Sequence, residues 1–480
     1  MNQRANTRRP SSRRPNSGDT GKRPPFSNST PDKSRTKGSR FSSASSSSST
    51  GSSTKIMRKA GFAGKLHRGP VIDAATELAT HCAIKSQCGS CVYVNTNYGE
   101  SLRRKFDVDI SILREAGVID AAQILDPLPS PTPLGYRSYF KLAVRPATPS
   151  QKNAAEREGT KRRFAIGLFE PGTHNVSVDL RDCPVHTKPL TNLLKSIEAE
   201  IELSAIEPWN ETTGDGDLRY IAARAAHLTG EIMLTFVTIK PKKNELVKLV
   251  NRLRRMGHKI NSAFMNINSS NGNAIFGHET ILLAGSSALR ERVCDLDIEI
   301  SPLAFFQVNP WQANNLYRRV EMHAGRGRGS DTAWDLYTGT GQMALLLARS
   351  GYRALGIEEV ESATVDAIRN AKRNDLGERA NFISARVEDC ETLVPEWAKS
   401  PKVIVVNPSR RGLHEGARNH LTHVLRAQTC NKFIYVSCEV ETLARDLKAL
   451  TTSGYKVRQV EAFDMFAQTD KLEWLVVLTR

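Results

Sequence analysis

One cysteine near the C-terminus is placed where a thiol could act as a nucleophile. The segment FIYVSCEVETLARDL, residues 433–447, reads as an apolar buried strand that ends at Cys438 and is followed by a helix-like pattern. A helix start can favour the thiolate, which is the reactive form of cysteine. A small buried hydrophobe is the commoner fate of a free cysteine, so the residue type alone leaves both interpretations open.

A glycine-rich turn forms a second candidate site. In WDLYTGTGQMALLLA, Asp335 ends a predicted strand, and Gly339 and Gly341 let the backbone turn closely into a helix. Glu358 ends the next strand, in ALGIEE, where a carboxylate can bind ribose hydroxyls. The turn lacks the full G-x-G-x-x-G spacing, and a purely structural turn is the alternative. Together the turn and the second acid favour a cofactor that contains adenosine.

An amide side chain follows another predicted strand. The segment KVIVVNPSRRGL places Asn407 before Pro408 at the carboxyl end of that strand. An amide offers both a donor and an acceptor, so Asn407 could bind a planar base of a cofactor or a substrate. An ordinary Asn-Pro turn explains the dipeptide equally well.

Four cysteines have the spacing of a metal site. They are Cys82, Cys88 and Cys91, in the pattern C-x5-C-x2-C, and Cys183, in RDCPVH. Four thiolates suit tetrahedral zinc or a four-iron cluster, and the spacing does not separate the two. No secretory signal precedes them, so we expect a reducing, cytoplasmic setting rather than a disulfide scaffold.

The periodicity of the chain predicts the scaffold that positions these residues. Residues 296–480 alternate strand and helix patterns, which is typical of a Rossmann-like, doubly wound parallel sheet with ligands at the carboxyl ends of its strands. Residues 71–295 mix strand patterns such as YFKLAVRP with the amphipathic helix patterns LTNLLKSIEAEI and NELVKLVNRLRRMG. We expect an α/β protein, with a Rossmann-like domain at 296–480 and a mixed α/β middle domain at 71–295 that carries the cysteines.

Residues 1–70 differ from the remainder of the 480-residue chain. They carry 16 Lys and Arg against two acids, whereas the other residues carry 52 against 48, and large apolar side chains are scarce. This composition predicts a disordered tail that contacts a polyanion such as RNA. A solubilising tail and a transit peptide are the alternatives. No stretch approaches the roughly 20 apolar residues of a membrane span, so a soluble protein is expected.

Five segments together resemble a known family. SPLAFFQVN, DLYTGTGQ, VVNPSRRGL, YVSCEVETLARDL and DMFAQTDKLE resemble motifs of the S-adenosylmethionine-dependent RNA uracil-C5 methyltransferases, over roughly residues 80–480. Within that family the chain looks most similar to the branch that carries a [4Fe-4S] cluster, modifies 23S ribosomal RNA and lacks an N-terminal TRAM domain. The resemblance implies S-adenosylmethionine as cofactor, 23S ribosomal RNA as the first expected partner, transfer RNA as the second, and no obligate protein partner.

The resemblance also implies a role for each matching residue. Cys438 corresponds to the nucleophile that adds to C6 of uracil, and Glu473 to the acid that removes the C5 proton. Phe305 corresponds to a residue that packs on the target base. Gln307 and Tyr337 correspond to cofactor contacts, and the four cysteines to the ligands of the [4Fe-4S] cluster.

Several positions depart from the family pattern. Glu439 stands where the family has Asn after the cysteine, and Lys471 occupies a usual His position shortly before the catalytic acid. Arg386 stands where a cofactor-binding Asp is common, which leaves Glu388 or Asp389 as candidates for that contact.

Two other functions are compatible with parts of the sequence. Exocyclic-amine methyltransferases also use N-P-P motifs, but an aromatic residue typically follows theirs. Here Arg410 follows Ser409, and Cys438 and Glu473 would be unexplained. A non-catalytic RNA-binding or ribosome assembly factor with a degenerate methyltransferase fold is the second alternative. Cofactor binding without methyl transfer would favour it.

Overall fold

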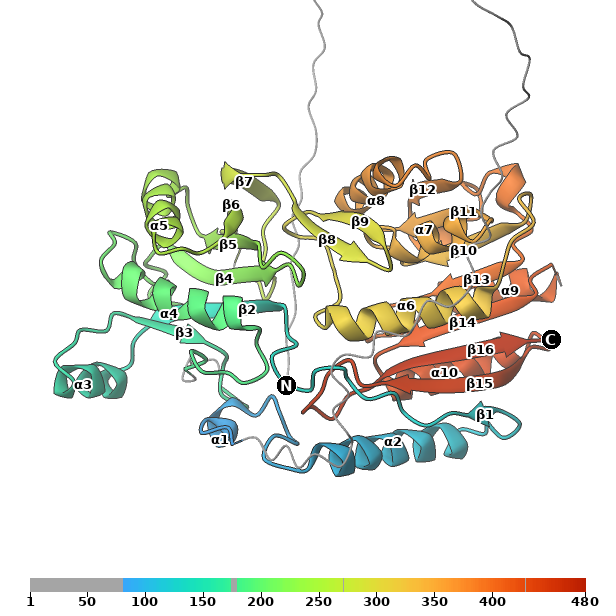
Figure 1. The fold of residues 1–480 in the computed structure, drawn as a ribbon, viewed down its shortest axis with the longest axis horizontal. Coiled ribbons are helices and arrows are strands. Elements are labelled where there is room, and N and C mark those ends of the chain that lie inside the picture. The colour runs from blue at the N-terminus through green and yellow to red at the C-terminus, as the bar shows by residue number, and fades with distance from the viewer. Residues whose placement is uncertain (1–80, 174–178, 271, 428) are drawn as a thin grey trace, which may run out of the picture. The chain divides into compact units, whose positions relative to one another are not determined.

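The computed structural model describes residues 81–173, 179–270, 272–427 and 429–480. The tail predicted at residues 1–70 lies outside the described residues. The described ranges contain an eight-stranded sheet, a six-stranded sheet and a two-stranded sheet (Figure 1). The predicted α/β class is confirmed. No described helix is long and apolar enough to cross a membrane.

The C-terminal part of the chain supplies most of the eight-stranded sheet. Its order is β1 (Gln123–Ile124), β15 (Lys456–Phe463), β16 (Glu473–Thr479), β14 (Lys432–Ser437), β13 (Val403–Val406), β10 (Thr332–Leu336), β11 (Arg353–Glu358) and β12 (Ala380–Ser384). Neighbours run parallel except that β16 is antiparallel to both β14 and β15, which corrects the prediction of a parallel sheet. Residues 464–472 join β15 to β16, and so short a connection suits antiparallel neighbours because a parallel crossover needs a dozen or more residues.

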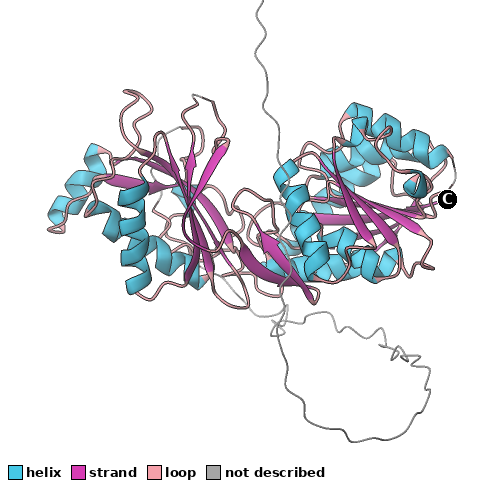
Figure 2. Ribbon diagram, turned by 90° about the horizontal axis from the view of Figure 1, so that it is seen from above, coloured by secondary structure: helices cyan, strands magenta, loops and turns pink. Residues whose placement is uncertain are grey.

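Helices cover both faces of this sheet (Figure 2) because side chains alternate along each strand. In β14, Phe433 and Tyr435 enter one hydrophobic core, whereas Ile434 and Val436 enter the other. The first core takes side chains from α2 (Tyr98–Glu115), α9 (Glu415–Arg426) and α10 (Val440–Thr451), and the second from α6 (Pro310–Ala324), α7 (Gln342–Arg349) and α8 (Glu361–Arg373). Two 3-10 turns, η1 (Val387–Asp389) and η2 (Glu396–Ala398), lie in the connection between β12 and β13.

The six-stranded sheet belongs to the middle of the chain. Its order is β3 (Phe164–Gly167), β2 (Tyr139–Pro146), β4 (Leu218–Ala225), β5 (Ile232–Thr238), β6 (Ile260–Ile267) and β7 (Glu279–Gly285). The two predicted amphipathic helices are present as α4 (Lys188–Glu202) and α5 (Lys243–Arg255), and both bury leucines in the core of this sheet. The remaining elements are α1 (Lys85–Cys88), α3 (Pro149–Arg157) and the hairpin of β8 (Leu289–Val293) and β9 (Leu296–Ile300).

Two elements that precede the six-stranded sheet in sequence join the eight-stranded one. β1 pairs in parallel with β15, and α2 packs Leu102 and Phe106 into the first core. The Phe106 ring stacks on Trp474 of β16, with ring centroids 5.8 Å apart. Residues 98–124 therefore support the strand that begins at Glu473. The division of the chain at residues 295 and 296 stays a prediction.

Candidate active site

Strand pairing brings Cys438 and Glu473 together at the adjacent ends of two neighbouring strands. β14 and β16 are antiparallel, and their register pairs Ser437 with Trp474. Cys438 follows Ser437, and Glu473 precedes Trp474, so the two predicted catalytic residues are neighbours across these strands. The charge of Glu473 contributes to raising the pKa of Cys438, which places the two side chains within electrostatic range.

Glu473 is a buried carboxyl group with an unpaired oxygen. The residue is 2 % exposed, and its Oε2 has no hydrogen-bond partner within the described part of the chain. Burial raises the pKa of Glu473 to about 8, although the charge of Arg410 lowers it. A carboxyl group whose pKa lies near neutrality can both accept and release a proton under physiological conditions.

Cys438 is a partly buried thiol in the turn between β14 and α10. Burial raises its pKa to about 11, the charges of Glu473 and Glu439 act in the same direction, and the charge of Arg410 opposes them. Burial, followed by the charge of Glu473, outweighs the expected benefit of the helix start, and the acidic N-cap residue of α10, Glu439, adds to the increase. The free thiol therefore keeps its proton at neutral pH.

Arg410 is a charged neighbour to which the sequence analysis assigned no role. It lies shortly after β13, it is exposed, and its charge lowers the pKa of both Cys438 and Glu473. A cation in this position stabilises negative charge on either group. The available signal was its place after Asn407, Pro408 and Ser409 in the strand-end motif.

Asp335 anchors the turn between β10 and α7. It is 1 % exposed, and its Oδ2 accepts hydrogen bonds from the Ala344 backbone N–H, at 2.8 Å, and from the Thr338 hydroxyl. Burial raises the pKa of Asp335 to about 7, although both hydrogen bonds lower it. These bonds tie the end of the strand to the start of the helix, so Asp335 shapes the turn.

The two predicted glycines have different structural roles, one beside open space and the other in close packing. Gly339 has φ of 56°, and a Cβ there would meet nothing within 4 Å, so the backbone faces open space that a ligand can enter. Gly341 has φ of 92° and is the N-cap of α7. A Cβ on Gly341 would lie 3.0 Å from the Cβ of Ala367, so this glycine is needed for close packing.

Two further predicted cofactor residues flank these glycines. Tyr337 has φ of 62°, a left-handed conformation that costs energy for a side chain of this size. Glu358 accepts hydrogen bonds from the backbone N–H groups of Gly339, at 2.9 Å, and Val360, at 3.0 Å. The second-strand acid thus lies against the glycine-rich turn.

A small cavity at the carboxyl end of β10 collects most of the predicted binding residues. Its lining includes Phe305, Asp335, Tyr337, Gly339 and Asn407. Phe305 is 66 % exposed, which leaves its ring available for stacking. Three predicted cofactor residues, Gln307, Gly341 and Glu358, lie outside that lining.

Tyr317 of α6 connects this cavity to the catalytic pair. It lines the cavity, and burial raises its pKa with contributions from the charges of Glu473 and Asp335. The phenol is therefore within electrostatic range of both carboxyl groups. The sequence analysis gave Tyr317 no role, because no motif marked this position.

The two acids proposed for the cofactor contact near Arg386, Glu388 and Asp389, have different surroundings. Arg386 and Asp389 form an exposed ion pair, with Nη2 and Oδ2 2.5 Å apart. Glu388 is less exposed, and its charge contributes to raising the pKa of Tyr337. Of the two candidate acids, Glu388 is the one whose charge acts on Tyr337 in the glycine-rich turn.

The four predicted metal ligands come from two segments, one around α1 and one before α4. They are Cys82, Cys88, Cys91 and Cys183. Burial and the three other thiols raise the pKa of Cys91 to about 12, and the Cys183 sulfur accepts hydrogen bonds from the backbone N–H groups of Val185 and His186. Nevertheless, the described ranges contain no group of three or more His, Cys, Asp or Glu side chains that could hold a metal ion. The four thiols still suit a metal or a cluster chemically, and Cys91 lies within electrostatic range of the other three.

The cysteine segments contact the connection between β15 and β16. The Tyr93 backbone N–H donates to the Gln468 carbonyl at 2.9 Å, and the Tyr136 hydroxyl donates to the Ala467 carbonyl at 2.8 Å. The Arg137 backbone N–H in turn donates to the Val185 carbonyl, close to Cys183. Both cysteine segments are therefore linked to the residues that lead into Glu473.

The fold and the turn after β10 define an S-adenosylmethionine-dependent methyltransferase. One solved neighbour is the Pyrococcus abyssi tRNA (uracil-54, C5)-methyltransferase in complex with S-adenosyl-L-homocysteine, with a TM-score of 0.62 and 28 % identity over 81 % of this chain and 85 % of that chain. Its bound product of methyl transfer agrees with the predicted cofactor.

Sequence comparisons identify the family more closely. The profile described as tRNA (Uracil-5-)-methyltransferase matches residues 397–480. An uncharacterized RNA methyltransferase of Geobacter sulfurreducens is 32 % identical over 83 % of this chain and 77 % of that protein, and one of Listeria innocua is 30 % identical over 89 % of each. The chain belongs to the S-adenosylmethionine-dependent RNA uracil-C5 methyltransferase family.

Proposed function

We propose that the protein methylates C5 of a uridine in RNA through a covalent bond between Cys438 and C6 of the base. The observation that carries the proposal is the β14–β16 register, which makes the thiol and the buried carboxyl group of Glu473 neighbours. Transfer of a methyl group to an exocyclic amine requires neither a thiol nor a second base at this position. The pair is therefore best explained by uracil-C5 chemistry.

The pair performs the two steps that C5 of uracil requires. Cys438 loses its thiol proton to solvent as its sulfur adds to C6, and the ring electrons move into an enolate whose nucleophilic carbon is C5. S-adenosylmethionine supplies the methyl group that C5 takes up. Glu473 then removes the C5 proton, the C5–C6 double bond re-forms, and the thiolate leaves.

The surroundings of each residue suit its proposed task. Glu473 is shielded from water, so a substrate proton rather than a solvent proton can reach its unpaired oxygen. Arg410 favours the thiolate form of Cys438 when the base arrives. Exposed Phe305 packs on the target base, and Asn407, which lines the same cavity, offers its amide to an edge of that base.

We propose 23S ribosomal RNA as the first substrate class and transfer RNA as the second. The cysteine-bearing branch that the chain resembles supports the first. The second is supported by the names of the matching profile and of the solved Pyrococcus abyssi neighbour, which both specify tRNA.

Mass mapping of 5-methyluridine distinguishes these functions. Ribosomal and transfer RNA would be compared from cells with the intact gene, with a deletion, and with Cys438→Ala. Loss of one 23S methyl group in both mutants is the expected result. Loss confined to transfer RNA would keep the mechanism and change the substrate, and unchanged RNA would support a non-catalytic RNA-binding or assembly factor.

We further propose that the four cysteines hold a [4Fe-4S] cluster whose role is to fix the two cysteine segments. The donor set, the electrostatic interactions among the thiols and the backbone N–H groups aimed at the Cys183 sulfur support this assignment. Iron, acid-labile sulfide and zinc would be measured in anaerobically purified protein and in Cys183→Ser. Iron and sulfide that disappear in the variant are expected, whereas stoichiometric zinc or no metal would contradict the cluster.

A further inference from the structure

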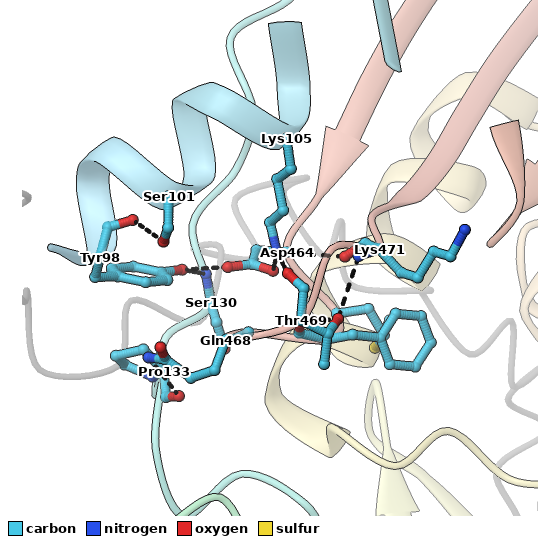
Figure 3. Close-up of polar contacts among 12 residues, drawn as sticks. Tyr98, Ser101, Lys105, Ser130, Pro133, Asp464, Gln468, Thr469 and Lys471 are labelled. Atoms are coloured by element: carbon cyan, nitrogen blue, oxygen red, sulfur yellow. Dashed lines mark hydrogen bonds and ion pairs between the residues drawn. The ribbon is translucent and has the colours of Figure 1, made fainter. Parts of the chain in front are cut away.

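The connection between β15 and β16 is held by a buried cation on α2 (Figure 3). Lys105 is 2 % exposed, and its Nζ lies 2.6 Å from Oδ1 of Asp464. The same ammonium group donates to the carbonyls of Thr469 and Lys471, each at 3.3 Å. The Tyr98 hydroxyl donates to the second oxygen of Asp464 at 2.8 Å. α2 therefore fixes both the beginning and the end of the connection that leads into Glu473.

The side chain of Lys471 extends this arrangement to the other catalytic residue. In Figure 3 it runs away from the Lys105 cluster, while its own carbonyl accepts from Lys105. Its Nζ lies 2.6 Å from Oε1 of Glu439, the residue directly after Cys438. The pair thus joins the turn that carries the thiol to the segment that carries Glu473.

The turn at Cys438 is compact enough to transmit this restraint. The Ser437 hydroxyl donates to the Glu439 carbonyl at 3.1 Å, and the Glu439 backbone N–H lies 3.2 Å from the same hydroxyl oxygen. Cys438 is the residue between them. A displacement of Glu439 therefore moves the backbone of Cys438.

The ion pair also connects two positions at which this chain departs from its family. Where the motifs of the family that the chain resembles have Asn and His, this chain has Glu439 and Lys471, and the structure places these two side chains in direct contact. Their side chains are 18 % and 30 % exposed, and a partly exposed ion pair contributes little to global stability. The ion pair is therefore better explained by a local positioning role.

We propose that Lys471 is a positioning residue that pairs with Glu439 and so holds the Cys438 turn in register with Glu473. This inference rests on the proposed uracil-C5 methylation. Lys471 acts through Glu439 and the backbone, and it requires no contact with the base. The neighbouring acids Asp470 and Glu441 interact with the same ammonium group, but only Glu439 adjoins the nucleophile.

The test is a set of charge variants of the full chain assayed on unmodified RNA. Lys471→Met is expected to lower kcat by roughly 10- to 100-fold with KM within about twofold, because misplacement of reacting groups lowers the rate without weakening binding. Lys471→Arg, which keeps the charge, is expected to stay within about threefold of the wild type. The reversed pair Glu439→Lys with Lys471→Glu is expected to recover at least about tenfold over either single reversal.

Two results would overturn the proposal. One is a reversed pair no more active than the single variants, which would show that the residues do not act through each other. The other is a rise in KM with unchanged kcat, which would assign Lys471 to RNA binding. Failure of the underlying function is recognised separately, because wild-type protein and Cys438→Ala would then give the same amount of 5-methyluridine.

Discussion

Two buried carboxyl groups occupy the strand ends of the same sheet, and they are used differently. Asp335 and Glu473 are both almost inaccessible, and burial raises the pKa of the first to about 7 and of the second to about 8. Asp335 accepts two hydrogen bonds from its own turn, whereas an oxygen of Glu473 has no partner within the described ranges. A satisfied buried acid stabilises the fold, and an unsatisfied one is available for a substrate.

The largest expected effect is on turnover at Glu473. Glu473→Gln keeps the size of the side chain and removes the base, so we expect methylation to fall by roughly 10²- to 10⁴-fold. Single-turnover transfer of a radiolabelled methyl group to RNA measures it. Asp335→Asn is the matched control, because an amide oxygen can still accept both hydrogen bonds. An equal loss of methylation activity in the two variants would show that the two acids do not differ in function.

The second effect is on stability at Asp335. Asp335→Ala leaves the Ala344 N–H and the Thr338 hydroxyl without their acceptor, whereas Glu473→Ala removes no hydrogen bond made by Oε2. We expect the free energy of unfolding to fall by about 1–3 kcal/mol more in Asp335→Ala than in Glu473→Ala. Urea unfolding measures the decrease in the free energy of unfolding in each variant. A larger decrease in Glu473→Ala than in Asp335→Ala would contradict the structural role of Asp335.

The pH dependence of stability gives a third contrast. The pKa of Glu473 is about 8 in the folded protein against an ordinary value of 4.5, so the folded state binds this proton more tightly. The free energy of unfolding therefore falls as pH rises from about 4.5 to about 8, by at most about 1.4 kcal/mol per pH unit from this group. Glu473→Gln lacks this contribution. The free energy of unfolding, measured at several pH values, should therefore fall more steeply with pH in the wild type than in Glu473→Gln between about pH 4.5 and pH 8. The same pH dependence in both proteins would contradict the raised pKa.

The smallest effect concerns the glycines beside Asp335. Gly339→Ala places a side chain in a left-handed conformation but in open space, so we expect a cost of about 1 kcal/mol. Gly341→Ala adds a close approach to Ala367 and should cost more. Calorimetry with S-adenosylhomocysteine should show weaker binding in Gly339→Ala, because the new methyl group enters the ligand's space. Unchanged affinity there would place the cofactor elsewhere.

Strands such as β10, β11, β13 and β14 could be predicted from the sequence because their apolar runs are local. β13 and β14 are four and six residues of mostly large apolar side chains, each ended by a turn residue. α2 was not predicted, because charged Lys105 and Asp109 occupy its buried face. Their partners, Asp464 and Trp474, lie more than 350 residues away in sequence. No local pattern reveals such compensation.

In the candidate site, too, local motifs could be predicted from the sequence, whereas contacts between distant segments could not. The glycine-rich turn is a contiguous motif, so its residues could be named in advance. The neighbourhood of Cys438 and Glu473 depends on an antiparallel register that alternating strand and helix patterns do not indicate. Arg410 and the Glu439–Lys471 pair depend on the same packing, and therefore became visible only in the structure.

Covalent trapping tests the central claim most directly. Glu473→Gln would be mixed with substrate RNA and S-adenosylmethionine, and the products examined by denaturing gel and mass spectrometry. The account predicts a methylated RNA–protein adduct through Cys438 that accumulates because the C5 proton is not removed, and that is lost when Cys438→Ala is added. A variant that forms no adduct, or an adduct that survives Cys438→Ala, would contradict the assigned roles.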